Sequence, residues 1–180
     1  MKNLITPICL FLLIIGAGSK KTGFEASEDF IVNPKRMTHI CVVVYDLNEV
    51  SKAYNEIFGV YVPEITVSAP YERSLTEYNG ESTEARVKMT FIKINNTVIE
   101  LIEPDHHPST WRDFLDKHGP GVHHIAFYAG QDIEEAIKKL KKRNMNILQH
   151  ANGYAYMDSK EQLGMVLELL GKSHRIGKPK

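Results

Sequence analysis

Two histidines and two glutamates interrupt strongly apolar stretches of this sequence, and together they could hold a metal ion. They are His39, Glu100, His124 and Glu168. A carboxylate between large aliphatic residues is costly to bury unless it is paired, protonated or bound to a cation. Imidazole combined with carboxylate suits a transition metal better than an ion such as Ca that prefers oxygen ligands alone. The residue types therefore predict one divalent metal ion, Co, Mn, Ni, Zn or Fe, with two nitrogen and two oxygen ligands.

The alternation of side chains along β-strands gives these four residues a common direction. Successive strand residues point to opposite faces of a sheet. Each histidine begins a predicted strand and has a small residue two places later, Cys41 after His39 and Ala126 after His124. If the two halves of the chain curve around one hollow, each half contributes one histidine and one glutamate to it.

Other assignments of these residues stay open at this point. Glu100 could instead point to solvent from an edge strand and pair with Lys93. His123 competes with His124, but alternation places it on the face of Ile125, away from the hollow, so we expect a supporting or surface position. The other histidines have no partner at ligand spacing and are not predicted ligands: His106, His107, His118, His150 and His174.

The order of predicted elements occurs twice along the chain. Apolar residues from Met37 onward switch between a period of two and a period of about 3.6, which predicts alternating strands and helices. In the first half we expect strands over residues 38–45, 60–67, 86–94 and 98–103, with a helix over 49–58. In the second half we expect strands over 122–128, 146–149, 154–158 and 165–170, with a helix after Asp132. The polar stretch 68–85 is expected to be a long loop that shapes the mouth of a pocket.

The N-terminal segment is predicted to lie outside this repeated unit. Lys2 precedes an apolar run and the small residues 16–19, an order that is typical of a signal peptide. The run is shorter than the roughly 20 residues that a membrane-spanning helix needs. We therefore expect residues 1–19 to be a signal peptide or N-terminal anchor, followed by a polar tether over 20–36. The protein would then be exported, periplasmic or secreted, or membrane-anchored, and cytoplasmic only without a working signal.

Charge and cysteine content limit what the protein can bind and how it is stabilised. The chain carries 22 basic and 22 acidic side chains, so its formal net charge is zero. A neutral protein lacks the positive field that attracts nucleic acids, and we expect no nucleic-acid partner. Removal of the predicted signal would leave Cys41 as the only cysteine, so the mature fold would depend on its core and not on a disulfide. Residues 172–180 form a basic tail.

Several of these segments resemble the vicinal oxygen chelate superfamily, the group of glyoxalase I, methylmalonyl-CoA epimerase, extradiol dioxygenases and antibiotic-resistance proteins. The matching segments are Thr38-His39-Ile40 and residues 98–104, 114–127 and 164–169. The most specific part, Gly121-Val122-His123-His124-Ile125, is most similar to methylmalonyl-CoA epimerase and glyoxalase-like proteins. The resemblance covers about residues 37–171. It implies an α+β fold in which tandem βαβββ modules, about 37–104 and 122–171, form a cupped mixed sheet.

The resemblance also implies the positions and the chemistry of the site. It places His39, Glu100, His124 and Glu168 at the metal-ligand positions, and so selects the second histidine of the pair. In such proteins a metal binds a carbonyl oxygen and a neighbouring oxygen of a small-molecule substrate, which acidifies the carbon-bound proton and stabilises the enolate. Glu168 or Glu100 moves that proton as a loosely held ligand, or a base outside the metal shell does so. The implied enzyme is an isomerase, epimerase or lyase, and the sequence leaves open whether two chains form a homodimer.

Departures from the epimerase pattern leave the substrate open. Epimerases commonly carry His-Pro and Gly-Gly near the last hairpin, and residues 157–164 here contain neither pair. One epimerase form has a glutamate base on the third strand, where Met89 stands in this chain. An exported protein would also not meet a CoA ester, because these esters are cytosolic. Two alternatives are therefore kept: an extradiol-type dioxygenase that holds Fe(II) with two histidines and a glutamate, and a non-catalytic small-molecule binding or resistance protein.

Overall fold

The computed structural model describes residues 30–130 and 133–172 of the chain. The predicted signal peptide or anchor, the first part of the tether and nearly all of the basic tail lie outside these residues. Within them, no helix is both long enough and apolar enough to cross a membrane.

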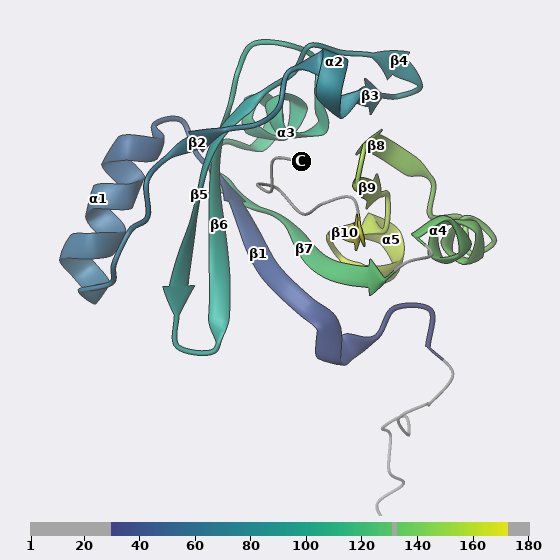
Figure 1. Ribbon diagram of the computed structural model, residues 1–180, viewed down its shortest axis with the longest axis horizontal. Coiled ribbons are helices and arrows are strands. Elements are labelled where there is room, and N and C mark those ends of the chain that lie inside the picture. The colour runs from purple at the N-terminus through teal and green to yellow at the C-terminus, as the bar shows by residue number, and fades with distance from the viewer. Residues whose placement is uncertain (1–29, 131–132, 173–180) are drawn as a thin grey trace, which may run out of the picture.

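In the described part of the chain, one curled sheet of ten strands forms the body of the molecule (Figure 1). The strands lie in the order β2-β5-β6-β1-β7-β10-β9-β8-β3-β4. Their bounds are β1 Met37–Val43, β2 Thr66–Val67, β3 Glu77–Tyr78, β4 Glu81–Ser82, β5 Val87–Ile94, β6 Thr97–Pro104, β7 Gly121–Gly130, β8 Ile147–Ala151, β9 Tyr154–Met157 and β10 Val166–Gly171.

The sheet is built from two halves with the same internal order. In the first half β1 pairs in parallel with β6, and β6 pairs antiparallel with β5. In the second half β7 pairs in parallel with β10, and β10 pairs antiparallel with β9. An antiparallel pairing of β1 with β7 joins the halves at the centre of the sheet. This arrangement confirms the predicted α+β fold with repeated modules in a cupped mixed sheet.

Two helices cover the outer face of the sheet, one in each half. Leu47 of α1 packs with Ile92 and Leu101, whereas Leu140 of α4 packs with Leu169. The helices are α1 Leu47–Phe58, α2 Tyr71–Ser74, α3 Thr110–His118, α4 Ile133–Lys141 and α5 Lys160–Leu163, preceded by the 3₁₀ helix η1 Pro34–Arg36. Because the long apolar helix faces lie outside, the inner face of the sheet is left for the site.

The ends of α1 follow the sequence signals. The side chain of Asp46 accepts a hydrogen bond from the backbone N–H of Glu49 at 3.0 Å, which caps the first turn. Gly59 ends the helix with a φ of 64°, in the left-handed region that a residue without Cβ adopts at little cost. The helix expected over 49–58 thus ends at the observed residue, whereas the observed α1 begins two residues earlier, at Leu47.

The stretch 60–85 differs from its expected structure. Only Thr66–Val67 of the strand expected over 60–67 pairs in the sheet. Pro63 lacks a backbone N–H for pairing, and its carbonyl accepts a hydrogen bond from the side chain of Thr90 at 3.0 Å. The expected loop 68–85 contains α2, β3 and β4, and β3 pairs with β8 of the other half. This segment therefore crosses from the first half to the edge of the second (Figure 1).

The fold begins earlier than the boundary expected at Met37. Ile31 and Val32 pack against the apolar cluster under α4. The guanidinium of Arg36 lies 4.2 Å from the ring centroid of Tyr128, a cation–π contact. Residues 31–36 are therefore part of the domain and not of a polar tether, because their apolar side chains gain from burial against the second half.

Candidate metal centre

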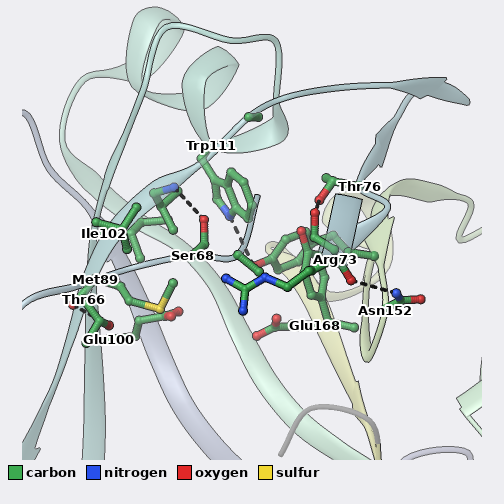
Figure 2. Close-up of a pocket in the computed structure, with 18 of the residues that line it drawn as sticks. Thr66, Ser68, Arg73, Thr76, Met89, Glu100, Ile102, Trp111, Asn152 and Glu168 are labelled. Atoms are coloured by element: carbon green, nitrogen blue, oxygen red, sulfur yellow. Dashed lines mark hydrogen bonds between the residues drawn. The ribbon is translucent and has the colours of Figure 1, made fainter. Parts of the chain in front are cut away.

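A cavity of about 380 Å³ lies on the inner side of the curled sheet (Figure 2). Its lining combines apolar side chains such as Met89 and Trp111 with three of the predicted site residues, His39, Glu100 and Glu168. An apolar cavity with a few convergent polar groups is the usual form of a small-molecule site.

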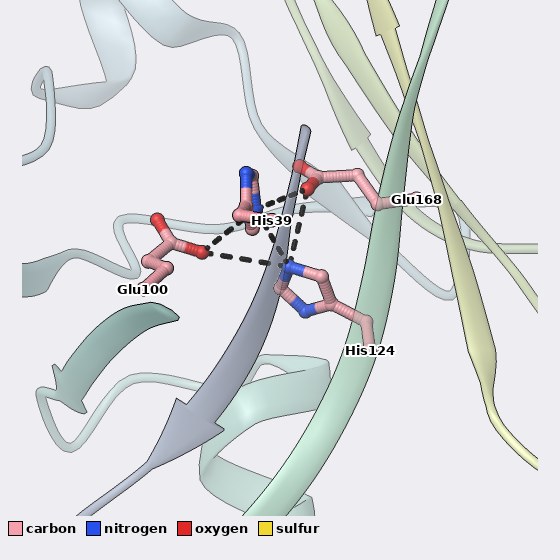
Figure 3. Close-up of side chains that lie close together, drawn as sticks. All are labelled: His39, Glu100, His124 and Glu168. Carbon is pink, nitrogen blue, oxygen red and sulfur yellow. Dashed lines mark hydrogen bonds and ion pairs between the residues drawn. The ribbon is translucent and has the colours of Figure 1, made fainter. Parts of the chain in front are cut away.

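The structure brings all four predicted site residues together beside this cavity (Figure 3). His39 lies on β1, Glu100 on β6, His124 on β7 and Glu168 on β10, and these strands are neighbours in the centre of the sheet. All four residues are buried, and one nitrogen or oxygen of each lies within 4.8 Å of the others. Each half thus contributes one imidazole and one carboxylate.

The spacing of these atoms matches the corners of a coordination polyhedron. Nε2 of His39 lies 3.2 Å from Oε2 of Glu100 and 3.1 Å from Oε2 of Glu168. Nε2 of His124 lies 3.1 Å from Oε2 of Glu168, 3.5 Å from Oε2 of Glu100 and 3.4 Å from Nε2 of His39. Ligands about 2.1 Å from a metal are about 3.0 Å apart at a right angle and about 3.4 Å apart at a tetrahedral angle.

Glu100 belongs to this cluster and does not face solvent. The residue is 8% exposed and its Oε2 lies close to both imidazoles. The alternative pairing with Lys93 is therefore wrong. The reason is topological, because β6 is covered on one side by β5 and on the other by β1 and is not an edge strand.

The hydrogen bonds around His39 leave Nε2 free to bind a cation. The hydroxyl of Thr38 donates to the carbonyl of Ala126 at 3.1 Å. That hydroxyl lies 3.2 Å from Nδ1 of His39, and since its hydrogen is already used, it accepts the Nδ1–H. The neutral ring therefore carries its hydrogen on Nδ1 and directs the lone pair of Nε2 toward the carboxylates.

A β-bulge overturns the expected position of His123. Cys41 pairs with His124, but the next residue, Val42, pairs with Val122, so His123 is an extra residue in β7. An extra residue breaks the alternation of side chains, which explains why the expected placement on the opposite face, with Ile125, is wrong. His123 is 3% exposed, and its Nδ1 lies 2.8 Å from Nδ1 of His124.

Through this bulge His123 orients the imidazole of His124. Nε2 of His123 lies 3.3 Å from the carbonyl of Thr110, which can only accept, and 3.2 Å from the hydroxyl of the same residue, which can also accept. A hydrogen on Nε2 of His123 satisfies both contacts. Its Nδ1 then accepts the Nδ1–H of His124, whose Nε2 is left with a lone pair that faces the cluster. Burial and the neighbouring His124 lower the pKa of His123 to about 3, which keeps it neutral and able to accept.

The donor set of this cluster fits a divalent cation. Two carboxylates and two Nε2 lone pairs converge, and all of them are acceptors. Of the described residues, Glu168 has the only buried carboxylate oxygen without a hydrogen bond of acceptable geometry, although Oε2 lies 3.1 Å from both imidazoles. A buried oxygen that lacks a donor is costly unless a cation balances it. These residues would therefore hold one divalent ion.

Without a cation, protons on the imidazoles would balance part of the negative charge of the two carboxylates. Burial alone would lower the pKa of His39, but the carboxylates of Glu100 and Glu168 outweigh burial and raise it to about 10. Burial alone would raise the pKa of both carboxyls, and the two histidines instead hold it below its ordinary range. A metal ion that binds here at neutral pH therefore displaces protons from the imidazoles.

Replacing the supporting histidine gives a first test of this centre. We expect His123→Phe to lower the affinity for Co²⁺ or Zn²⁺ by about 10- to 100-fold, because the Nδ1–H of His124 loses its acceptor. Phenylalanine preserves the edge contacts of this ring with Phe114 and Tyr156. Competition titration against a metal-binding dye measures the change.

The matched control is His118→Phe, since His118 packs on the same Phe114 ring from the exposed end of α3. It should bind metal like the parent protein. Equal affinities of the His123→Phe variant and the parent protein would show that His123 does not support the centre.

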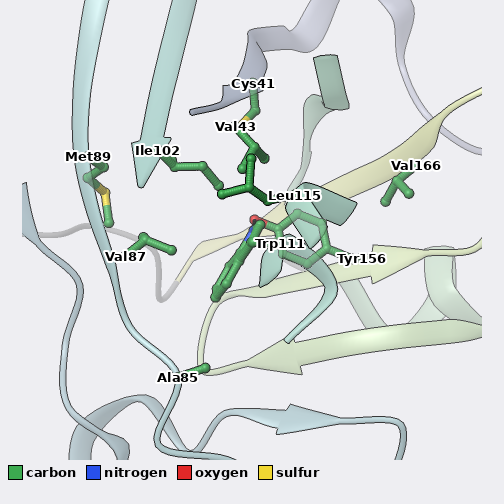
Figure 4. Packing of buried hydrophobic residues seen from close by; sticks show 10 residues of the cluster. All are labelled: Cys41, Val43, Ala85, Val87, Met89, Ile102, Trp111, Leu115, Tyr156 and Val166. Atoms are coloured by element: carbon green, nitrogen blue, oxygen red, sulfur yellow. Dashed lines mark hydrogen bonds between the residues drawn. The ribbon is translucent and has the colours of Figure 1, made fainter. Parts of the chain in front are cut away.

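Buried apolar residues and one aromatic pair hold the cluster and the cavity in place (Figure 4). Cys41 and Val43 of β1 pack with Trp111 and Leu115 of α3 and with Tyr156 of β9. Nε1–H of Trp111 donates to the hydroxyl of Tyr156 at 3.2 Å. The ring centroid of Tyr156 lies 4.8 Å from that of His124. The contacts of Trp111 and Tyr156 therefore connect the cavity wall to the cluster.

Other predicted and rejected positions lie apart from this centre. Met89 belongs to the apolar wall of the cavity, and the described lining residues include no carboxylate besides Glu100 and Glu168. His107 pairs with Asp105, and His150 pairs with Glu77. His106 stacks on the ring of His107, and His174 lies outside the described residues. The five histidines not predicted as ligands are thus absent from the cluster as far as the structure describes them.

Sequence reasoning missed the polar residues that orient the two imidazoles. They are Thr38 and Thr110, together with the Trp111–Tyr156 contact. The only local signal was the hydroxyl or second imidazole next to each predicted ligand, as in Thr38-His39 and His123-His124.

Comparison with known proteins finds one matching superfamily and several similar epimerases. The family described as Glyoxalase/Bleomycin resistance protein/Dioxygenase superfamily matches residues 38–159. A mitochondrial methylmalonyl-CoA epimerase of Dictyostelium discoideum is 27% identical over 177 residues, which cover 94% of this chain and 95% of the relative. The mitochondrial methylmalonyl-CoA epimerase of Homo sapiens is 28% identical over 163 residues, which cover 86% of this chain and 84% of the relative.

A solved structure has the same fold. It is a methylmalonyl-CoA epimerase in complex with methylmalonyl-CoA and NH4+, with a TM-score of 0.56 and 23% identity. The similarity covers 80% of this chain and 98% of that chain. It supports the paired-module architecture described above.

Proposed function

Because this chain belongs to the glyoxalase/bleomycin resistance protein/dioxygenase superfamily and is an enzyme of the epimerase type, we propose that it moves a proton at the carbon beside a substrate carbonyl, with the help of one divalent metal ion. The observation that carries this proposal is the convergence of His39, Glu100, His124 and Glu168 beside an otherwise largely apolar cavity.

The four clustered residues would hold the ion, and the cavity would hold the substrate next to it. A divalent ion held by these residues would supply a positive charge that polarises a carbonyl oxygen and makes the neighbouring C–H more acidic. The apolar part of the cavity wall, which includes Met89 and Trp111, would lower the local dielectric constant and so strengthen the electrostatic interactions beside it.

Glu168 is the proposed proton carrier. Its carboxylate lines the cavity, and its Oε2 has no hydrogen bond of acceptable geometry with the described residues, so that oxygen is not already used by a protein donor. The described cavity lining provides no carboxylate outside the cluster. A base outside the metal shell, which the sequence left open, thus has no carboxylate candidate in that lining.

Tyr156 is proposed to donate a hydrogen bond to a substrate oxygen. Its hydroxyl accepts from Nε1–H of Trp111, so its own hydrogen is left to point elsewhere. Burial and the charges of Glu168 and Glu100 raise the pKa of Tyr156 well above its ordinary value. The hydroxyl therefore acts as a donor and not as a base.

Methylmalonyl-CoA is the first substrate to test, because it is the substrate named for the epimerase relatives. Its thioester carbonyl and its carboxylate flank one acidic carbon, which matches the predicted substrate with a carbonyl and a neighbouring oxygen. This substrate and the signal-peptide prediction exclude each other, since CoA esters occur inside cells. The compartment in which the full chain is found therefore tests the signal-peptide prediction, and export would exclude methylmalonyl-CoA as the substrate.

Proton exchange in heavy water tests the proposed function directly. The metal-loaded protein is expected to introduce deuterium at the carbon between the two carbonyl groups of methylmalonyl-CoA, which proton NMR detects as loss of the C–H signal. Dimethylmalonyl-CoA has no hydrogen at that carbon and serves as the control for exchange elsewhere. Binding without exchange would support a binding protein instead, and oxygen uptake with a catechol would support a dioxygenase.

A further inference from the structure

We infer that Arg73 binds an anionic group of the substrate at the mouth of the cavity, so that the natural substrate carries a carboxylate or phosphate in addition to its reacting carbonyl. The inference rests on the proposed function only in treating this cavity as the substrate site. Arg73 lies in the segment 68–85 that crosses between the two halves. This segment is not part of the order of strands that the two modules share.

Arg73 is the one lysine or arginine among the described residues that line the cavity. It lies on α2, and Figure 2 shows its side chain reaching over the cavity from the crossing segment. The other polar residues of the lining are uncharged, apart from the titratable groups of the metal centre and the tyrosines. The guanidinium thus supplies the permanent positive charge of this cavity wall.

The guanidinium of Arg73 has no acidic partner among the described residues. The side chains of three other arginines among the described residues have partners. Arg112 pairs with Asp116, the side chain of Arg86 donates to the carbonyl of Ser68, and that of Arg36 stacks on Tyr128. An arginine without a partner can give its planar pair of N–H groups to a carboxylate or a phosphate.

The backbone of Arg73 is held in place by the opposite half of the molecule. The side-chain amide of Asn152, between β8 and β9, donates to the carbonyl of Arg73 at 2.9 Å. The backbone N–H of Asn152 donates to the carbonyl of Ser74 at 2.8 Å. The pairing of Glu77 with His150 continues this contact along β8. A charged side chain whose backbone is fixed in this way can select a ligand at low entropic cost.

The charges of the cavity favour an anionic ligand at this position. With a divalent ion bound, the two carboxylates of the cluster would balance its charge, and no negative charge would be left there to neutralise the guanidinium. Transfer of a proton from the substrate carbon to the carboxylate of Glu168 moves negative charge from Glu168 onto the substrate and leaves the total charge of the cavity unchanged. A cation at the mouth stabilises such a species in surroundings of low dielectric constant.

The anionic group could belong to the acyl part of the substrate or to its carrier, and two probes distinguish these sources. Dimethylmalonyl-CoA carries a carboxylate and phosphates but no exchangeable C–H between its carbonyl groups. Its N-acetylcysteamine thioester keeps the carboxylate and lacks the phosphates. Binding of each probe to the metal-loaded full chain is measured by calorimetry, a readout that does not depend on turnover.

Arg73→Met removes the charge and keeps much of the apolar stem. We expect it to weaken binding of dimethylmalonyl-CoA by about 10- to 100-fold, the loss typical of one charge-assisted hydrogen-bond pair. A carboxylate contact predicts the same loss with the N-acetylcysteamine thioester. A phosphate contact predicts the loss with the CoA thioester and with free CoA only. Arg73→Lys should recover part of the affinity, because lysine keeps the charge but not the paired N–H groups.

The matched control is Arg143→Met, which removes an exposed arginine that does not line the cavity. Affinities of the Arg73→Met variant within twofold of the parent protein for both thioesters, or an equal loss in the Arg143→Met variant, would overturn the inference. Failure of the proposed function has a different signature. In that case the parent protein exchanges no proton of methylmalonyl-CoA, yet Arg73→Met still weakens binding of the probes.

Discussion

Removal of the divalent ion with a chelator is expected to abolish proton exchange by this protein, with a loss of at least about 10³-fold. Stabilisation of the charge that develops on a carbonyl oxygen is worth several kcal/mol, and each 1.36 kcal/mol changes the rate about tenfold. Re-addition of Co²⁺, Mn²⁺, Ni²⁺, Zn²⁺ or Fe²⁺ should restore the rate for at least one of these ions. Metal analysis of the reloaded protein should find one ion per chain.

Variants of two histidines distinguish a specific centre from adventitious metal. His124→Ala should lose most of the bound metal, because it removes one of the converging ligand atoms. His150→Ala should retain one ion per chain, because His150 pairs with Glu77 on an outer strand, away from the cluster. Full exchange activity of the metal-free protein would contradict the proposed role of the cluster.

Glu168→Gln is expected to reduce proton exchange by about 10² to 10⁴ while the protein still binds one metal ion. The amide retains an oxygen that can face the ion but cannot take a proton at neutral pH, and a loss of this size is typical for removal of a general base. The rate of deuterium uptake by methylmalonyl-CoA, divided by the bound metal, measures the effect free of changes in metal content.

Glu100→Gln is the matched control, since Glu100 lies in the same cluster on the other half of the sheet. This variant should keep both the metal and an exchange rate within about tenfold of the parent. If Glu100→Gln instead shows the larger loss, Glu100 is the proton carrier and the proposed role of Glu168 is wrong. Comparable large losses in both variants would show that the two carboxylates cannot be assigned separate roles.

Alternation of side chains predicted much of the site but failed at one residue. His39, Glu100, His124 and Glu168 all face the inner side, as the period of two indicates. His123 also reaches the cluster, because β7 contains one extra residue opposite β1. A bulge depends on how two strands far apart in the sequence pair, so the local pattern of residues does not reveal it.

The mouth of the cavity was the least predictable part of the fold. The segment 68–85 looks like a polar loop in the sequence, yet its residues pair with β8 in the other half. The partners Glu77 and His150 belong to different modules, and no periodic pattern within either module indicates their contact. The position of Arg73 over the cavity follows from this pairing and from the contacts of Asn152.

The amino-acid sequence by itself determined the residue types of the centre, the repeated order of strands and helices, and local ends such as the Asp46 cap of α1. These features depend on preferences that act over a few neighbouring residues. Only the tertiary structure decided the orientation of both imidazoles, the unsatisfied oxygen of Glu168 and the anchoring of Arg73. Each of these depends on hydrogen bonds or strand pairings between residues distant in sequence, and such pairings form only when the two halves pack together.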